Sequence, residues 1–281
     1  VGKDAGLGLR LFDGRLAARA VYFETQSRYN STTFSTATVD GNARILGALR
    51  AAGRITQADY DKRITIAGIG QFDYDATGFE FEVTVNPAKY LRIRANYSIT
   101  DPIQSNIYPE WLAWDAQNVA WLATVNTAGV ITSQSSRTIA QEVTAYQAEI
   151  AEATASDGRG TLGNRRHKVS VFARHDLGWM GWPGAFVGAG YRHQSKMFTG
   201  VNSTGDFRYG NSFGRADAMA GYTFNLKKKH LRNLTLQLDV QNVLNQHAPL
   251  VTRYLDDAGL IVKRLVVQSP ITWQLSTKLH F

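Results

Sequence analysis

The sequence predicts an all-β fold, an antiparallel transmembrane β-barrel of which the chain carries only part, with about nine strands. Three observations lead to this prediction. Apolar and polar residues alternate over segments of about ten residues, the length that a tilted strand needs to cross a membrane. Tight turns and long connections follow one another in turn along the chain. No apolar run approaches the roughly 18 residues that a membrane-spanning helix requires.

The first two predicted hairpins show the alternation most clearly. Residues 7–22 form the first, with a two-residue turn at Asp13-Gly14 between two stretches in which every second residue is apolar. Residues 79–99 form the second, with its turn at 86–89. Each hairpin therefore has one apolar and one polar face.

The later strands continue this pattern to the end of the chain. An aromatic turn with Trp179, Trp182 and Pro183 joins the strands of the third hairpin, and a basic turn at 227–230 joins those of the fourth. The predicted later strands are 168–175, 185–198, 216–224, 234–240 and 271–281.

The connections differ in length in a regular way. The long ones are 30–69, 101–167 and 246–270, and tight turns alternate with them. A soluble β-sandwich has no reason to keep its long loops at one end, whereas outer-membrane barrels have short periplasmic turns and long external loops. The asymmetry therefore places the tight turns in the periplasm and the long loops outside the cell.

Two of the external loops carry helical patterns. Pro109 stands at the first turn of one predicted helix, and Thr138 with Gln141 forms a capping box at the start of another. A weaker helical pattern spans 43–54. We expect short helices in these loops.

A spanning sheet must close into a barrel because lipid offers no partner to an unpaired backbone group. The apolar residues then face lipid and the polar ones face the lumen, with aromatic side chains at the two interfaces. The predicted periplasmic girdle comprises Trp179, Trp182, Tyr222, Phe224 and Phe281, and the outer one Tyr22, Tyr97 and Tyr191. The alternative is a half-buried sheet on a soluble core, but no second sheet or amphipathic helix is predicted to cover so many strands.

Composition narrows the function further. The net charge of +8 comes from cations scattered singly along the strands, which indicates solvated faces and a polar lumen and argues against a nucleic-acid partner. The chain has no cysteine, its histidines lack the spacing of a metal site, and it has no nucleophile elbow, phosphate loop or HExxH motif. We expect no enzyme activity, no cofactor and no protein-bound metal.

Two segments near the carboxyl end resemble a known family. They are Asn233-Leu-Thr-Leu-Gln-Leu-Asp-Val-Gln-Asn-Val-Leu-Asn245 and Trp273-Gln-Leu-Ser-Thr-Lys-Leu-His-Phe281. They are similar to the end of TonB-dependent outer-membrane receptors, in which a strand ends in an Asn-aliphatic-aliphatic-Asn element and the chain ends on phenylalanine. Gly78-Phe-Glu-Phe-Glu82 and Gly188-Ala-Gly-Tyr-Arg192 also resemble the barrel of this family.

The resemblance implies a place in a larger protein. Residues 1–281 would be the carboxyl-terminal portion of the barrel, approximately strands fourteen to twenty-two of a 22-stranded transporter whose lumen holds a plug. The amino-terminal plug and the early strands would be missing, and with them the segment that engages TonB–ExbB–ExbD. The implied partners are outer-membrane lipid, the plug and the barrel-assembly machinery, which would read Trp273, Leu275, Leu279 and Phe281.

The family takes up scarce ligands, most often ferric siderophores, and the arginines suggest where an anionic one would bind. The alternation points Arg92, Arg94, Arg174 and Arg192 to the lumen and places Arg165 and Arg166 at its external mouth. The alternative is ion pairing inside the lumen, for example of Glu80 or Glu82 with Arg92 or Arg94, or contact with the plug.

The tryptophans of the longest loop are a second set of candidates. Trp111, Trp114 and Trp121 could stack on an aromatic chelator or on a sugar ring. The alternative is that they pack the helix that carries them.

Three functions remain open from the sequence. The leading one is TonB-energised uptake of a ferric siderophore, with carbohydrate, haem or cobalamin as other ligands of the same family. A passive outer-membrane porin is the second, and it requires further strands with no plug. A soluble β-sheet binding module is the third. The alternating connections favour the first two, and the helical loops with the Asn242 to Asn245 element favour the receptor.

Overall fold

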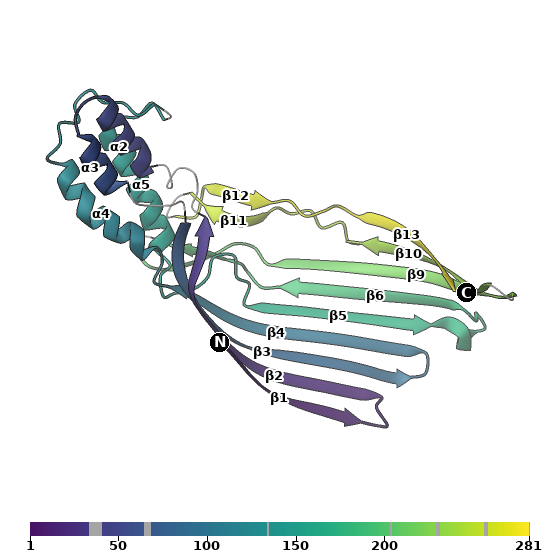
Figure 1. The fold of residues 1–281 in the computed structure, drawn as a ribbon. Helices are drawn as coiled ribbons and strands as arrows, with labels where there is room; N and C mark the ends of the chain where they lie inside the picture. The colour runs from purple at the N-terminus through teal and green to yellow at the C-terminus, as the bar shows by residue number, and fades with distance from the viewer. Residues whose placement is uncertain are drawn as a thin grey trace. The chain divides into compact units, whose positions relative to one another are not determined.

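The computed structural model describes residues 1–33, 41–64, 69–133, 135–202, 204–228, 231–255 and 258–280 (Figure 1). These residues form two compact units, each with its own contacts. The sheet unit comprises Gly2–Thr25, Ala76–Pro102 and Leu162–Phe281. The helical unit comprises Val1, Gln26–Asp75 and Ile103–Thr161.

Nine strands of the described chain form one sheet (Figure 1). Their order across the sheet is the same as their order along the chain. They are β1 (Gly2–Leu11), β2 (Leu16–Thr33), β3 (Ile69–Ala88), β4 (Leu91–Ser105), β5 (His167–Asp176), β6 (Ala185–Gln194), β9 (Phe213–Lys228), β10 (Leu231–Gln241) and β13 (Thr272–His280). The pairing is antiparallel, as between β4 and β5 and between β10 and β13. The predicted all-β fold with about nine strands is confirmed.

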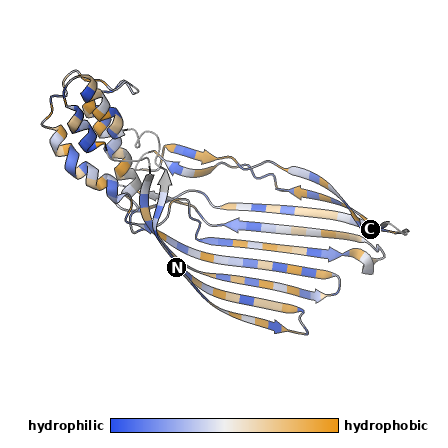
Figure 2. Ribbon diagram, in the orientation of Figure 1, coloured by the Kyte–Doolittle hydropathy of each residue, from blue (hydrophilic) through white to orange (hydrophobic). Residues whose placement is uncertain are grey.

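The register gives the sheet two chemically different faces. Ala95 pairs with Val171 and Leu238 with Leu275 on what we call the apolar face. Figure 2 shows the resulting alternation of hydrophilic and hydrophobic residues along the strands. On the opposite side, the polar face, the register brings together Arg92, Arg94, Lys168, Arg174, Arg192, Arg215, Asp217, Asp239 and Lys278.

The connections alternate as predicted. The first two hairpins turn at 12–15 and at 89–90, and a 3-10 turn at Leu177–Met180 follows β5. The residues that join β9 to β10, Lys229 and His230, lie outside the described residues. The long connections join the opposite ends of the strands. One of them follows β6, and its first residues were predicted to be part of that strand.

That connection corrects one predicted element. The strand expected over 185–198 ends at Gln194, because the chain leaves the sheet there and forms a separate hairpin of β7 (Phe198–Val201) and β8 (Phe207–Tyr209). A second hairpin, β11 (Leu250–Tyr254) with β12 (Val262–Val266), lies in the connection before β13.

The predicted second hairpin also began too late. β3 starts at Ile69, and its first half pairs with the second half of β2 within the helical unit. There the backbone N–H of Tyr29 donates to Asp73 at 3.0 Å, and Arg28 forms an ion pair with Asp75 at 2.9 Å. Residues 71–76 also alternate, but their apolar residues have even numbers whereas those of 79–85 have odd numbers, so the phase of the alternation reverses within β3.

Among the described residues, the long loops contain four helices: α2 (Gly41–Ala51), α3 (Gln57–Arg63), α4 (Pro109–Leu122) and α5 (Ile139–Thr154). Pro109 is in the first turn of α4, and the Thr138–Gln141 capping box is present at α5, as predicted. The sequence pattern did not predict α3, whose capping box uses Asp59 at the third helical position. In the described part of the chain no helix combines the length and apolar character needed to cross a membrane.

The four helices share a hydrophobic core built from two loops that are distant in the sequence. One cluster joins α2 to α4 and α5 through Leu46, Trp111, Trp114, Tyr146 and Ile150. A second cluster contains Ile45, Leu49, Leu122, Val130 and Ile139. Each fully buried side chain of this size stabilises the unit by about 1.5–3 kcal/mol, so the helices depend on one another for stability.

Candidate functional site

The structure brings four of the predicted ligand-binding arginines to one face. Arg92 lies opposite Arg174 across β4 and β5, and Arg192 on β6 lies opposite Ser170. Arg94 is two residues along β4 from Arg92 and therefore shares its face. This is the polar face, which the sequence assigned to the lumen.

Arg192 has a carboxylate partner, Asp217, on the neighbouring strand β9. Asp217 accepts from Arg192 Nη2 at 2.8 Å and from Arg215 Nη2 at 3.3 Å, and its Oδ1 also accepts the backbone N–H of Asn242 at 2.9 Å. The charge of Arg192 is therefore compensated within the protein. Ion pairing was the predicted alternative for this residue, and its partner is Asp217.

No such compensation is seen on β4. Within the described residues, the structure records no ion pair for Arg94, Glu80 or Glu82, and Arg92 donates only to Asn86, from Nε to Oδ1 at 3.3 Å. The predicted pairing of these glutamates with Arg92 or Arg94 is absent from this geometry. The two arginines of β4 thus remain available to an anion.

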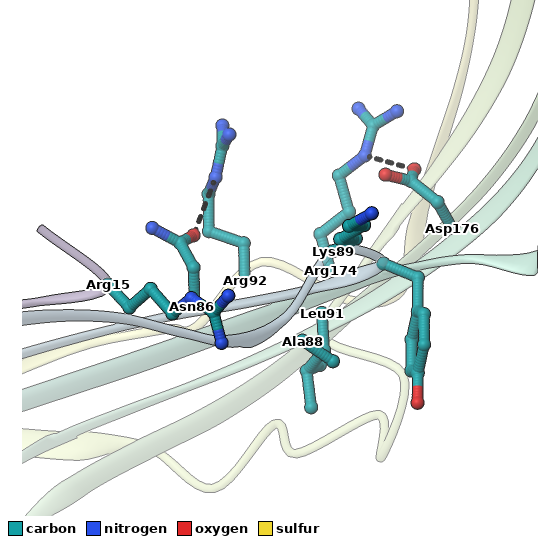
Figure 3. A pocket seen from close by; sticks show the side chains of 9 residues that line it. Arg15, Asn86, Ala88, Lys89, Leu91, Arg92, Arg174 and Asp176 are labelled. Atoms are coloured by element: carbon teal, nitrogen blue, oxygen red, sulfur yellow. Dashed lines mark hydrogen bonds and ion pairs between the residues drawn. The ribbon is translucent and has the colours of Figure 1, made fainter. Parts of the chain in front are cut away.

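A cavity of about 690 Å³ lies at the turn end of the polar face (Figure 3). We call it the turn-end cavity. Figure 3 shows Arg92 and Arg174 on the same side of the sheet, with Leu91 on the opposite side. Its lining residues are Arg15, Asn86, Ala88, Lys89, Tyr90, Leu91, Arg92, Arg174 and Asp176.

The two arginines predicted at the external mouth have internal partners. Arg165 is 8% exposed and donates from Nη1 to the carbonyl oxygens of Ser195 at 2.6 Å and Asn211 at 2.7 Å, which ties together the ends of two connections. Arg166 forms a 2.7 Å ion pair with Asp101. This geometry favours a structural role for Arg165.

The predicted tryptophans are inside the helical unit. Trp111 and Trp114 are buried against Tyr146, and Trp114 Nε1 donates to the carbonyl oxygen of Arg63 at 2.8 Å. The guanidinium of Arg63 in turn lies 3.7 Å from the centre of the Trp121 ring. The arrangement agrees with packing, the alternative that the sequence left open, and offers no free face of Trp111 to a ligand.

Residues 2–243 match the family model described as TonB dependent receptor-like, beta-barrel. The chain belongs to the TonB-dependent receptor family. The family is one of transport receptors and not of enzymes. None of the curated proteins matches the chain.

Solved structures show the same fold. The ferric preacinetobactin receptor BauA from Acinetobacter baumannii is 12% identical, with a TM-score of 0.51 over 99% of this chain and 29% of its own. The siderophore receptor PiuA from the same organism is 14% identical, with a TM-score of 0.50 over 99% of this chain and 28% of its own. The pyoverdine outer membrane receptor FpvA from Pseudomonas aeruginosa PAO1 is 14% identical, with a TM-score of 0.50 over 100% of this chain and 30% of its own. The chain thus spans less than a third of these receptors' length.

The Asn-aliphatic-aliphatic-Asn element of this TonB-dependent receptor chain is a structural joint. Asn242 is 1% exposed and has a φ of +54°, and its side-chain amide donates to the carbonyl oxygens of Gln246 and Ser269, both at 2.9 Å. Its Oδ1 accepts the Gln246 N–H at 3.0 Å, and Asn245 Oδ1 accepts the N–H of Ile271 at 3.2 Å. The element therefore closes the connection between β10 and β13, a contact that the sequence resemblance did not reveal.

The predicted assembly residues of the receptor lie on β13. Trp273, Leu275 and Leu279 share the apolar face and are exposed, Leu275 by 73%. Phe281 lies outside the described residues. Recognition of these side chains by the assembly machinery remains a prediction.

A buried carboxylate holds the helical unit of the receptor together. The side chain of Glu142 is 1% exposed and accepts from Arg44 Nε and from Ser135 Oγ, both at 2.6 Å, while Arg137 lies at 3.7 Å. Burial raises the pKa of Glu142, but the bonds from Ser135 and Arg44 and the charges of both arginines outweigh burial, so the pKa lies below its usual value.

We expect acid to weaken the helical unit through Glu142. A folded-state pKa below the unfolded one stabilises the unit above the unfolded value, near 4, and that stabilisation is lost as the pH falls through the folded pKa. Hydrogen exchange of the α2 and α5 amides should accelerate at low pH. Glu142→Gln should cost about 3 kcal/mol at neutral pH, because Arg44 loses its charge partner, and should flatten the acid response. An unchanged acid response in the variant would contradict this account.

Proposed function

We propose that the chain is the carboxyl-terminal portion of the barrel of an outer-membrane receptor that imports an anionic ferric siderophore. The family match over residues 2–243 carries the receptor function. The anionic ligand is supported by the uncompensated arginines of the polar face, because guanidinium groups bind carboxylate and other oxygen anions in a paired geometry.

The plug, the early strands and the segment that engages TonB would lie in parts of the receptor outside this chain. A plug and the early strands would precede residue 1, which is consistent with a chain that spans less than a third of the solved receptors. The plug would fill the lumen against the polar face, and its amino-terminal extension would engage TonB–ExbB–ExbD. The apolar face would contact outer-membrane lipid.

Uptake of radiolabelled iron tests this proposal. The complete receptor is expressed in a Gram-negative strain that lacks its own ferric-siderophore receptors, with and without a functional TonB. We expect TonB-dependent accumulation of iron presented as a ferric siderophore. Accumulation that persists without TonB would favour a passive porin, and a receptor that takes up only neutral sugars, haem or cobalamin would contradict the assigned ligand.

A further inference from the structure

The cations of the polar face are compensated unevenly. On β6 and β9, Arg192 and Arg215 share the carboxylate of Asp217. In the turn-end cavity, four cationic side chains are accompanied by the single carboxylate of Asp176. The excess positive charge is therefore concentrated at the end of the face that carries the tight turns.

Arg92 and Arg174, two of the three arginines that line the turn-end cavity, are held by Nε and leave their Nη nitrogens available. Arg174 donates from Nε to Asp176 at 3.2 Å, and its guanidinium lies 3.9 Å from the centre of the buried Phe186 ring. Arg92 uses Nε for Asn86. No hydrogen bond recorded among the described residues uses the Nη nitrogens of either arginine. These nitrogens can therefore donate to an oxygen anion.

The neighbouring groups complete a concave basic surface. Lys89 is exposed at the β3–β4 turn, and the carbonyl oxygen of Arg15 accepts the N–H of Asn86 at 2.7 Å, which holds the two turns together. Lys89 and Arg174 both line the cavity (Figure 3). A volume of about 690 Å³ is large enough for a small multivalent anion.

We propose that the turn-end cavity is an anion-binding site at the periplasmic exit of the receptor, one that binds the carboxylate or phosphate oxygens of a ligand as it leaves the lumen. This inference rests on the proposed function for the direction of transport. The site itself is inferred from the register, the cavity and the charge imbalance, without reference to the direction of transport. An acidic side chain from another part of the receptor has the same chemistry, and the test separates it from a free anion.

Calorimetric titration of the complete receptor in detergent with inorganic pyrophosphate tests the site. We expect saturable binding, weakened by salt. The double variant Lys89→Gln/Arg92→Gln should bind at least about tenfold more weakly, because it loses charge-assisted hydrogen bonds. Adding Arg174→Gln should abolish binding. The double variant retains Arg174 and its Phe186 contact, so it tests the site even if the triple variant fails to fold.

Arg10→Gln/Lys278→Gln is the matched control, because it removes one arginine and one lysine from the polar face outside the cavity. Its pyrophosphate affinity should stay within about twofold of the parent. Equal weakening in both double variants would show a general charge effect and overturn the site. Absence of binding to the parent, with a loss of thermal stability in Lys89→Gln/Arg92→Gln, would show that an acidic side chain of the receptor fills the cavity and would also overturn it.

Iron uptake then tests the exit role separately. In cells, Lys89→Gln/Arg92→Gln should lower the maximal uptake rate of the ferric siderophore several-fold and leave the half-saturating concentration unchanged. A changed half-saturating concentration with a normal maximal rate would overturn the exit role. If the parent takes up no ferric siderophore, the proposed function fails, whereas the pyrophosphate titration still decides on the cavity.

Discussion

Replacing Asn242 with alanine should destabilise the barrel by about 3–5 kcal/mol, since a buried residue would lose three side-chain hydrogen bonds and leave their partners unsatisfied. Alanine is also poorly suited to the φ of +54° at this position. The joint between β10 and β13 would lose these bonds, and the connection to the last strand would become less ordered. Urea unfolding of the complete receptor in detergent, followed by tryptophan fluorescence, measures the effect.

Two further variants separate the backbone from the side chain. Asn242→Gly tolerates the positive φ and should be less destabilising than alanine by about 1 kcal/mol. Asn225→Ala is the matched control, because Asn225 is exposed on β9 and no hydrogen bond of its side chain is recorded in the described structure. A parent-like unfolding curve for Asn242→Ala would mean that the buried amide bonds do not hold this joint.

The sequence predicted the barrel wherever one face of a strand is apolar. Residues 91–99 and 234–240 alternate strictly, and both became strands with the expected faces. Over 71–76 polar and apolar residues also alternate, but in the opposite phase to 79–85, and these residues pair with the second half of β2 in the helical unit. Because the two halves of β3 differ in phase, a single alternating pattern predicted only the second half of the strand.

Contacts between elements that are distant along the chain could not be predicted from the sequence pattern. Alternation predicted the face of Arg192, but its ion pair with Asp217 requires β6 to lie beside β9 across a connection that contains its own hairpin. The pairing of Arg174 with Asp176 was within reach, since residues two apart on a strand share a face. The Thr56–Asp59 capping box is also visible in the sequence, with aspartate at the position where glutamate or glutamine is usual.

Burial of the tryptophans depended on a second loop. The helical pattern of 109–122 gave no indication that α2, from a different connection, covers Trp111 and Trp114. A ligand platform and a packed core have the same sequence pattern, because both place aromatic side chains on one side of a helix. Only the fold of the other loop distinguishes them.

Replacing Trp111 with alanine should unfold the helical unit and leave the sheet intact. The side chain is 0% exposed and lies at the centre of a cluster with Leu46, Tyr146 and Ile150, and truncation of such a residue costs about 3–5 kcal/mol. A unit of this size has little stability to spare, whereas the sheet unit has its own contacts. Hydrogen exchange and limited proteolysis of the complete receptor should show loss of protection over α2 to α5 alone.

Matched variants distinguish packing from ligand stacking. Leu112→Ala changes the neighbouring residue on α4, which is 45% exposed, and should leave the protection of the helices unchanged. Trp111→Phe keeps an aromatic ring in the core and should retain most of that protection. If Trp111 instead stacks on ligand, Trp111→Ala would weaken siderophore binding while the helical amides stay as protected as in the parent. That result would reject the packing role, because a cavity of this size in a small core cannot leave the surrounding hydrogen bonds unaffected.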